Sequence, residues 1–481
     1  MNEIDIEKLN EIELDKSRHP EWKYTSNATF QLTVSLLLTT MAVFLFFYYE
    51  AVLGLNAWYV FLALSLWTIY DAINDPLIGF ILDRNTRLTK RWGRRFPWIV
   101  IGVAPWCLSL YLIFSAPDID ASVNPWPVFL WLLVTLILFD TFGTLVQVNV
   151  QMLRPDLFRT ERERRKLSSR YMPFDMIAMA LGMLIPPLFL SAGAQRASFA
   201  LMGAMVALIA LICGILFLPG FREDKIVIDR YFTGEYESMS FFKGMKEVLH
   251  QRSFVTYFIM LTCFLTATNL MVANSVFLII FVIQADPENI TLIFAVLLLG
   301  ALISVPFWIK TLKKMNNNKK LVTIGGFAIT AAMIPLTFFL TLLDLLIMLF
   351  ILGFCLGSLW GFIYTIIQAN VVDDYVAKTK KNQKGILIGT SLFFGKLAAT
   401  LDELIIATVH SLTGFVPGKA TYSELAGAVA DINLVLLGIR LLSGVIPAII
   451  MLIGTLIFWK YYPLTQDEVM KNKKELEKLG F

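Results

Sequence analysis

Two aspartates stand inside a long apolar stretch of the chain, where a helix buried in lipid would hold them away from water. Asp71 and Asp75 are four residues apart, so on a helix their carboxylates share one face. Two carboxylates that close repel each other, and they need a cation between them or a proton on one of them. The amide oxygen of Asn74 adds a ligand that suits a hard cation such as sodium. The competing interpretation is a pair of acids bonded to basic residues of a neighbouring helix.

A second polar group recurs at helical spacing along a later apolar stretch. Its members are Asp140, Thr144, Gln147 and Gln151. We expect Thr144 and Gln147 to complete the cation site, and Asp140 and Gln151 to contact a substrate in a central cavity. The alternative is a structural role as hydrogen-bonding partners between helices, where each bond contributes only ~0.6 kcal/mol.

A third group combines a lysine with two acids in the last third of the chain. Lys396 lies deep in an apolar block, and Glu403 follows seven residues later on the same helical face, directly after Asp402. A charge at the centre of a spanning helix costs ~2.5–3.5 kcal/mol, so such residues usually face the protein interior and have a function. We expect Lys396 to neutralise the aspartates when the cation leaves, or to bind substrate; a static ion pair is the alternative. Trp360 is a further substrate candidate, because an aromatic face can stack on a sugar ring.

The composition places the chain in a membrane. Of its 481 residues, 57% are hydrophobic and 16% are charged, against about 25% charged residues in a soluble globular protein. The apolar residues form blocks long enough to cross a bilayer, which takes about 20 residues in a helix. Lipid offers the backbone no hydrogen-bond partner, so these blocks must be helical. The expected fold class is therefore an all-α polytopic membrane protein.

Twelve spans can be counted in the sequence. They fall near 28–54, 57–82, 97–116, 126–153, 172–192, 197–220, 253–284, 289–312, 320–343, 345–372, 385–415 and 433–461. The polar stretch 221–252 divides them into two six-helix halves. The predicted domains are a tail at 1–27, an N-terminal half at 28–220, the central loop at 221–252, a C-terminal half at 253–462 and a tail at 463–481.

The loop charges predict the orientation in the membrane. Lysine and arginine concentrate at 83–95, 154–170, 310–320 and 378–384, whereas 117–125 and 285–289 are poor in them. By the positive-inside rule, the basic loops and both termini are cytoplasmic. The N-terminal stretch lacks the apolar core of a cleaved signal peptide. We expect a multi-pass protein of the cell membrane that contacts the lipid bilayer and functions as a monomer.

Catalytic and metal-binding patterns are missing from the sequence. The four cysteines lie singly inside apolar blocks and the three histidines are far apart, which leaves no ligand spacing for a transition metal. No Ser/His or Cys/His constellation is present. The net charge of +4 is small, and contact with anionic lipid headgroups explains the basic loops. We expect no enzyme, no cofactor beyond a coupling ion, no metal beyond a sodium ion and no nucleic-acid partner.

Several motifs resemble those of known transporters. The pattern Gly79-x-x-x-Asp83-Arg84 is similar to the loop 2–3 motif of the major facilitator superfamily, which implies a gating role for these three residues. The sharper match is Asp71-Ala-Ile-Asn74-Asp75-Pro76-Leu-Ile-Gly79, followed by Trp92-Gly93-Arg94-Arg95-Phe96-Pro97-Trp98. It resembles the glycoside–pentoside–hexuronide:cation symporters. Further matches extend the resemblance over nearly the whole chain: Arg162-Glu163-Arg164, Ser240-Phe241-Phe242, Asn370 through Tyr375, and Gly385 through Lys396.

The resemblance implies a major facilitator fold of 12 transmembrane helices. It also implies a site for sodium, lithium or a proton at Asp71 and Asp75, with Asn74 and Thr144 as neighbours. Lys396 would lie at the boundary between the cation site and the sugar site.

The chain also departs from the family pattern. The family's acid and tryptophan on span four fall at Gln147 and Gln151, and its sugar-binding acid on span one falls near Ser35. The arginine on span five falls near Arg170 or Met172, which makes Arg170 a candidate substrate ligand. Extra acids are present at Asp140, Asp175, Asp402 and Glu403. The cation half of the site is thus mostly kept, and the sugar half is changed.

The leading hypothesis is secondary active symport. Entry of sodium or a proton would drive uptake of a small polar solute, expected from the resemblance to be a glycoside, pentoside or hexuronide, by alternating access of the two halves. Major facilitators that carry lysolipids share the Asp-x-x-x-Asp-Pro feature and the basic loop, so a sodium-dependent lysolipid-type carrier is an alternative. A non-transporting membrane receptor on the same fold is another.

Overall fold

The computed structural model describes residues 19–82, 92–158, 161–190, 195–223, 249–286, 289–315, 317–360, 363, 367–379 and 384–478. Within these ranges it does not describe the side chains at 75–77, 79–82, 155–156, 161, 172, 379, 384–389, 391–393, 473 and 477–478. All regular structure in the described ranges is helical, which confirms the all-α class. The chain divides into two compact units. Unit 1 comprises Met1–Tyr48 and Leu62–Tyr236, and unit 2 comprises Tyr49–Phe61 and Glu237–Phe481.

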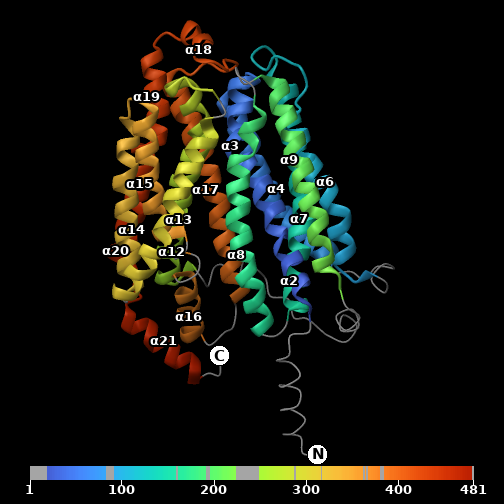
Figure 1. Ribbon diagram of the computed structural model, residues 1–481, viewed down its shortest axis with the longest axis vertical. Coiled ribbons are helices and arrows are strands. Elements are labelled where there is room, and N and C mark those ends of the chain that lie inside the picture. The colour runs from blue at the N-terminus through green and yellow to red at the C-terminus, as the bar shows by residue number, and fades with distance from the viewer. Residues whose placement is uncertain are drawn as a thin grey trace, which may run out of the picture. The chain divides into compact units, whose positions relative to one another are not determined.

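The long helices of unit 1 run side by side (Figure 1). They are α2 (Glu21–Ala28), α3 (Phe30–Phe47), α4 (Ala57–Leu82, from Leu62 on), α6 (Phe96–Phe114), α7 (Pro125–Leu157), α8 (Glu161–Leu184) and α9 (Arg196–Phe217). The short helical segments η1 (Tyr48–Val52), η2 (Pro186–Phe189) and η3 (Leu218–Phe221) follow α3, α8 and α9, and η1 belongs to unit 2 from Tyr49 on. Proline stands in the first turn of α6 and of α7, where its missing N–H leaves no hydrogen bond unmade.

Unit 2 is also built from helices, some of which are extended by short helical segments. They are α12 (Arg252–Phe277), α13 (Asn289–Met315), α14 (Asn318–Met333), α15 (Leu342–Trp360), α16 (Gln368–Thr379), α17 (Lys384–Thr413), α18 (Tyr422–Ala428), α19 (Ile432–Ser443), α20 (Val445–Tyr461) and α21 (Gln466–Lys478). Two short turns, η4 (Leu278–Ile283) and η5 (Ile334–Thr337), extend α12 and α14. Within this unit α18 lies at one end, and α16 and α21 lie at the other (Figure 1).

Ten helical segments of the described residues are long and apolar enough to cross a bilayer. They match ten of the twelve predicted spans. The other two predicted spans, 57–82 and 385–415, correspond to α4 and α17, which are helices of 26 and 30 residues. The total of twelve spans therefore stays a prediction. The last predicted span is one apolar segment built from two helices, α19 and α20, that meet at Gly444.

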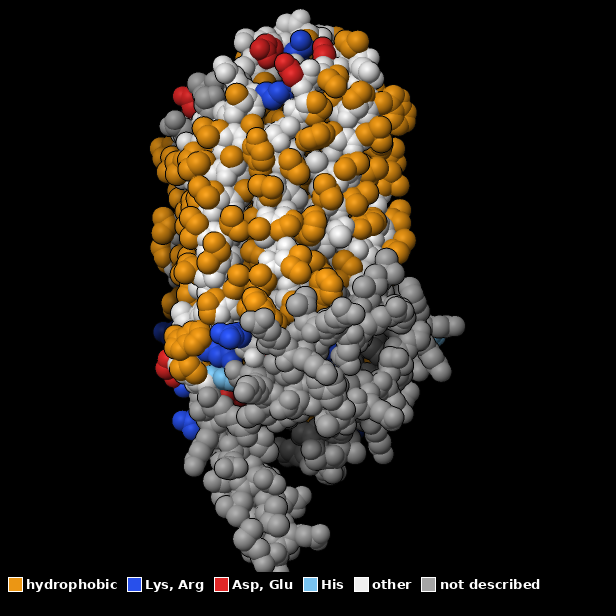
Figure 2. Space-filling model, turned by 90° about the vertical axis from the view of Figure 1, so that its right-hand side faces the viewer, with side chains coloured by type: hydrophobic (Ala, Val, Ile, Leu, Met, Phe, Trp, Pro, Cys, Tyr) orange, Lys and Arg blue, Asp and Glu red, His pale blue; other side chains and the backbone are white. Residues whose placement is uncertain are grey.

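Apolar side chains cover the outside as well as the inside, as lipid requires. Figure 2 shows a broad band of hydrophobic side chains on one face, with the described charged side chains gathered beyond its edges. Inside unit 1, the rings of Tyr48, Phe114 and Phe199 pack together, with centroids 5.0 Å apart for Tyr48 and Phe199. Inside unit 2, Phe277 and Phe415 pack around His410.

Candidate functional site

The structure brings polar side chains of α4 and α7 together within unit 1. Asn74 Nδ2 donates a 2.9 Å hydrogen bond to Oδ2 of Asp140. The Tyr70 hydroxyl lies 2.8 Å from the Thr141 hydroxyl and donates to Oδ1 of Asn74 over 3.4 Å. These contacts set the register between the two helices at the depth of the predicted cation site.

Four of the predicted site residues are buried at this point. Asp71, Asn74, Asp140 and Thr144 are 7%, 3%, 8% and 5% exposed, so each needs a partner other than bulk water. Asp71 and Asn74 share a face of α4, and Asp140 and Thr144 share a face of α7. We call these four residues the α4–α7 polar group. Its carboxylate, amide and hydroxyl oxygens are the ligand types that a hard cation takes.

The structure leaves other predictions on these helices open. Asp75 and Gly79 lie on α4, but the Asp75 side chain is outside the described residues, as are Asp83 and Arg84. Gln147 is half-buried and Gln151 is exposed, further along α7. Asp140 accepts a hydrogen bond from Asn74 of the predicted cation set, and its contact with substrate stays a prediction.

A second polar cluster joins α3 to α8 in the same unit. Gln31 Nε2 and Ser35 Oγ both donate to Oδ1 of Asp175, over 2.7 and 3.0 Å. The Tyr171 hydroxyl donates to Oε1 of Gln31 over 2.5 Å. We call Gln31, Ser35, Tyr171 and Asp175 the α3–α8 polar group. The guanidinium of Arg154 lies over the Tyr171 ring, 4.4 Å from its centroid.

Ser35 stands where the resemblance would place an acid on the first span, and its hydroxyl donates to an acid of α8, Asp175. Close approach of the two helices depends on Gly182, because a Cβ atom there would lie 2.8 Å from Cβ of Thr39 and 3.1 Å from the Ser35 carbonyl oxygen. Sequence reasoning flagged Asp175 as an extra acid but had no means of placing it beside Ser35.

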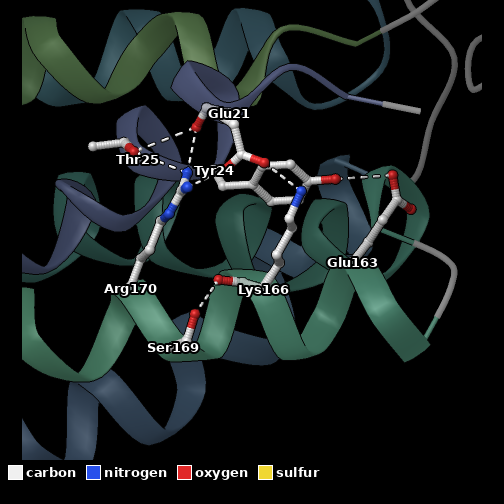
Figure 3. A network of polar contacts seen from close by, with 7 residues as sticks. All are labelled: Glu21, Tyr24, Thr25, Glu163, Lys166, Ser169 and Arg170. Atoms are coloured by element: carbon white, nitrogen blue, oxygen red, sulfur yellow. Dashed lines mark hydrogen bonds and ion pairs between the residues drawn. The ribbon is translucent and has the colours of Figure 1, made fainter. Parts of the chain in front are cut away.

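Arg170 lies at the N-terminal part of α8 and contacts α2 (Figure 3). Its guanidinium forms an ion pair with Glu21 and donates to the Thr25 hydroxyl over 3.0 Å. Lys166 pairs with the same carboxylate, and the Tyr24 hydroxyl donates to Glu163 over 3.2 Å. The predicted substrate ligand is thus engaged in docking α2 onto α8, and a role in substrate binding stays a prediction.

The comparison with protein families decides the class to which these helices belong. Residues 26–466 match the family described as MFS/sugar transport protein. The chain belongs to this major facilitator family.

Curated relatives of this facilitator are similar over nearly its whole length. The sodium-dependent lysophosphatidylcholine symporter 1-A of Danio rerio is 24% identical over 520 residues, which covers 99% of this chain and 92% of the relative. The sphingosine-1-phosphate transporter MFSD2B of Xenopus tropicalis is 23% identical and covers 91% of this chain and 86% of the relative. Among solved structures, an inward-facing bacterial homologue of the human lysosomal transporter Spinster superposes with a TM-score of 0.65 at 14% identity. It covers 95% of this chain and 99% of that chain, and it supports the fold.

One motif of the facilitator forms a backbone cradle for a carboxylate. Gly93 has a φ of +94°, and the N–H groups of Arg94, Arg95 and Phe96 all donate to the carboxylate of Glu223, over 3.2, 2.7 and 3.0 Å. A Cβ atom on Gly93 would lie 2.3 Å from Cδ of Glu223. The segment at the start of α6 is therefore fastened to the chain that follows η3, a contact that sequence reasoning missed.

A second motif joins helices at one end of unit 2. The Asp374 side chain is 1% exposed and accepts from Ser253 of α12 over 2.7 Å and from Asn472 of α21 over 3.1 Å. Lys378 pairs with it from the next turn of α16, at 2.8 Å. In this facilitator the acid thus holds α12, α16 and α21 together.

The remaining predicted substrate residues of the facilitator lie in unit 2. Trp360 is the half-buried last residue of α15, and Lys396 is half-buried on α17. Within the described residues, no group of three or more His, Cys, Asp or Glu side chains is arranged to hold a metal ion. The candidate cation ligands are instead mixed carboxylate, amide and hydroxyl oxygens.

Proposed function

We propose that the protein is a sodium-coupled symporter that carries a lysolipid-type amphiphile across a membrane. The observation that carries the proposal is the α4–α7 polar group, in which the Asn74–Asp140 hydrogen bond holds buried oxygen ligands together between two helices. Buried acids in membrane helices mark ion pathways, because an uncompensated charge there is costly. A cation among these oxygens compensates the carboxylates.

Coupling follows from linkage between the cation and the substrate. If sodium at the polar group raises the affinity for substrate, substrate must raise the affinity for sodium by the same factor. Each sodium ion that enters down a membrane potential of 100 mV supplies ~2.3 kcal/mol. Alternating access is the mechanism we propose.

One observation favours an amphiphilic substrate over a sugar. Relatives that align along most of the chain are named as carriers of lysophosphatidylcholine or sphingosine-1-phosphate.

A sugar or other polar solute is the second candidate substrate. The matching family is described as MFS/sugar transport protein, and the α3–α8 polar group offers the carboxylate of Asp175, the single amide group of Gln31, and the hydroxyls of Ser35 and Tyr171. Sugar hydroxyls bind groups of this kind. The motifs that resemble glycoside symporters point the same way, although the relatives with full-length similarity favour the lysolipid.

The test is uptake into proteoliposomes under an imposed sodium gradient. Labelled lysophosphatidylcholine and a panel of labelled glycosides are compared, with and without the gradient. Asp71→Asn removes one buried carboxylate, and Asp118→Asn makes the same chemical change at an exposed residue of the same unit. We expect sodium-driven uptake of the lysolipid that Asp71→Asn abolishes and Asp118→Asn leaves intact.

Other outcomes support a different function. Sodium-driven uptake of a glycoside alone would identify the protein as a sugar symporter. Saturable binding of a ligand with no accumulation under any gradient favours the receptor interpretation. Uptake that is identical with sodium on either side, and unchanged in Asp71→Asn, contradicts the proposed role of the α4–α7 polar group.

A further inference from the structure

Two adjacent acids on α17, the buried Asp402 and the half-buried Glu403, lie in unit 2, remote in sequence from the α4–α7 polar group. Asp402 is 4% exposed. Within the part of the chain that the structure describes, neither carboxyl oxygen of Asp402 has a hydrogen-bond partner, and neither does Oε2 of Glu403. The amide of Asn269 on α12 approaches the Asp402 carboxyl, but without normal hydrogen-bond geometry to either oxygen. Buried polar atoms without a partner are uncommon in native structures, and they point to a ligand or a function.

The packing of α12 against α17 places Asn269 at this level. Three contacts define the register: Phe258 with Phe394 at 4.6 Å between ring centroids, Thr266 with the Ala398 carbonyl at 3.4 Å, and Phe277 with His410 at 4.9 Å between ring centroids. Residue numbers rise together along both helices, so α12 and α17 run in the same direction. Asn269 is three residues beyond Thr266, and Asp402 is four residues beyond Ala398. The packing of the two helices therefore holds the Asn269 amide beside the Asp402 carboxyl group.

The charged and titratable groups on the neighbouring elements are few. Between its first residue and its last, α12 carries only Tyr257 and Cys263, and Cys263 lies against Gly454 of α20. On α19, Arg440 is directed to the carbonyl oxygens of Phe339 and Thr337, at 2.6 and 3.3 Å. On α17 itself, His410 is paired with Glu50, and Lys396 lies two turns before Glu403.

The spacing of the two acids favours protons over a shared metal ion. Successive helix residues point about 100° apart, so Asp402 and Glu403 do not face each other as a chelating pair. The recorded neighbours of Asp402 are the Asn269 amide and Glu403, and one amide with one carboxyl supplies fewer oxygens than a sodium ion needs to replace its water shell. Two neighbouring carboxyls with buried oxygen atoms also resist simultaneous ionisation.

We propose that Asp402 and Glu403, with Asn269 beside them, form a proton-binding site in unit 2 that is separate from the cation site in unit 1. The pair of carboxyls holds a proton while it is shielded from water and releases this proton when α17 is exposed to water during the transport cycle. The site thereby adds a proton to the coupling. Its role in coupling rests on the proposed transport function, but proton binding at the site is testable without transport.

The first test is infrared spectroscopy of the full chain in lipid vesicles at neutral pH. Protonated carboxyl groups have a C=O stretching band that carboxylates lack. We expect this band to lose intensity in Asp402→Asn/Glu403→Gln, and to be unchanged in Glu468→Gln, an exposed acid on α21. Asp402→Asn alone keeps the size and polarity of the side chain, and it provides the same comparison if the double variant does not fold. An identical carboxyl band in wild type and variants overturns the proposal.

The second test is uptake of whichever substrate the sodium experiment identifies. For one coupled proton, a tenfold inward proton gradient raises the steady-state accumulation ratio by about tenfold. We expect this response in the wild type and its loss in Asp402→Asn/Glu403→Gln, with sodium-driven accumulation retained. A double variant that keeps the full proton response overturns the coupling role. Failure of all uptake, with the carboxyl band still lost in the variants, refutes the proposed transport function and leaves proton binding established.

Discussion

The side-chain amide of Asn74 on α4 donates a 2.9 Å hydrogen bond to Oδ2 of Asp140 on α7. This bond joins the two helices that contribute the candidate cation ligands. On the other side of the amide, Oδ1 of Asn74 accepts from the Tyr70 hydroxyl, which also contacts Thr141. Both polar atoms of the Asn74 amide are therefore held by hydrogen bonds. A change at Asp140 removes one of these contacts and alters the whole polar group.

Replacing Asp140 with asparagine tests this relationship. Asp140→Asn keeps the shape of the side chain but removes the charge that Asn74 Nδ2 faces. Hydrogen bonds to charged groups contribute about 1.5–3 kcal/mol, so we expect the sodium concentration for half-maximal uptake to rise by about tenfold or more. Sodium titration of uptake at a fixed substrate concentration measures the change.

Asp118→Asn is the matched control for this prediction, because the Asp118 side chain is fully exposed. It should leave the sodium titration unchanged. An Asp140→Asn variant with wild-type sodium dependence would show that the bond to Asn74 is only a link between helices.

Helical periodicity predicts which side chains of one helix share a face, but not which helices face each other. The spacing of Asp71 with Asn74 and of Asp140 with Thr144 was enough to select both halves of the α4–α7 polar group. It did not reveal that Asp140 bonds to Asn74, because that depends on the packing of α4 against α7. For the same reason, Asp175 could be recognised as an extra acid but not placed against Ser35.

Contacts made by backbone groups are harder to predict from the sequence than contacts made by side chains. Three N–H groups bind Glu223, and peptide N–H groups are present at every residue except proline. The available signal was Gly93, whose left-handed conformation most other residues adopt only at a cost. Glu50 was overlooked because it lies at the end of an apolar span, where an acid looks like an interfacial residue.

The role of the α3–α8 polar group is tested by Asp175→Asn. Both Gln31 and Ser35 donate to Oδ1 of Asp175, and asparagine still supplies an acceptor oxygen there. The variant therefore keeps the structural hydrogen bonds and loses only the charge. If the carboxylate binds substrate, we expect the KM for uptake to rise by about tenfold, as the loss of a charged hydrogen bond implies.

The sodium titration separates binding from folding in this variant. At saturating substrate, Asp175→Asn should have wild-type sodium dependence, because the α4–α7 polar group is intact. Ser35→Ala serves as a comparison that removes one neutral donor, and it should change KM less. An unaltered KM in Asp175→Asn would assign the cluster to helix packing alone.

The cradle around Glu223 should be a determinant of stability. In Gly93→Ala, the positive φ alone costs about 1–2 kcal/mol, and the added Cβ displaces the Glu223 carboxylate. We expect a lower midpoint of thermal unfolding in detergent for Gly93→Ala and for Glu223→Gln. Gly427→Ala on α18 is the matched control, since nothing lies within 4 Å of a Cβ at that position. Equal midpoints for Gly93→Ala and Gly427→Ala would contradict the importance of the cradle.

The final prediction concerns the buried contact between His410 and Glu50 in unit 2. Nδ1 of His410 lies 2.7 Å from Oε2 of Glu50, and their side chains are 2% and 1% exposed. The Glu50 carbonyl also accepts from the N–H of Gly418 over 2.9 Å. The segment Tyr49–Phe61 is thus fastened to the end of α17 through Glu50.

Removing one partner of a buried pair strands the other, at a cost of about 3–5 kcal/mol when both are charged. Glu50→Gln and His410→Gln should each lower the midpoint of thermal unfolding, and the double variant should be less destabilised than the sum of the two. Ser411→Ala is the neighbouring control, because its hydroxyl accepts an exposed hydrogen bond from Trp58, and it should have little effect. Additive destabilisation by the two single changes would mean that Glu50 and His410 stabilise unit 2 independently, since direct partners show a coupling of about 0.5–3 kcal/mol.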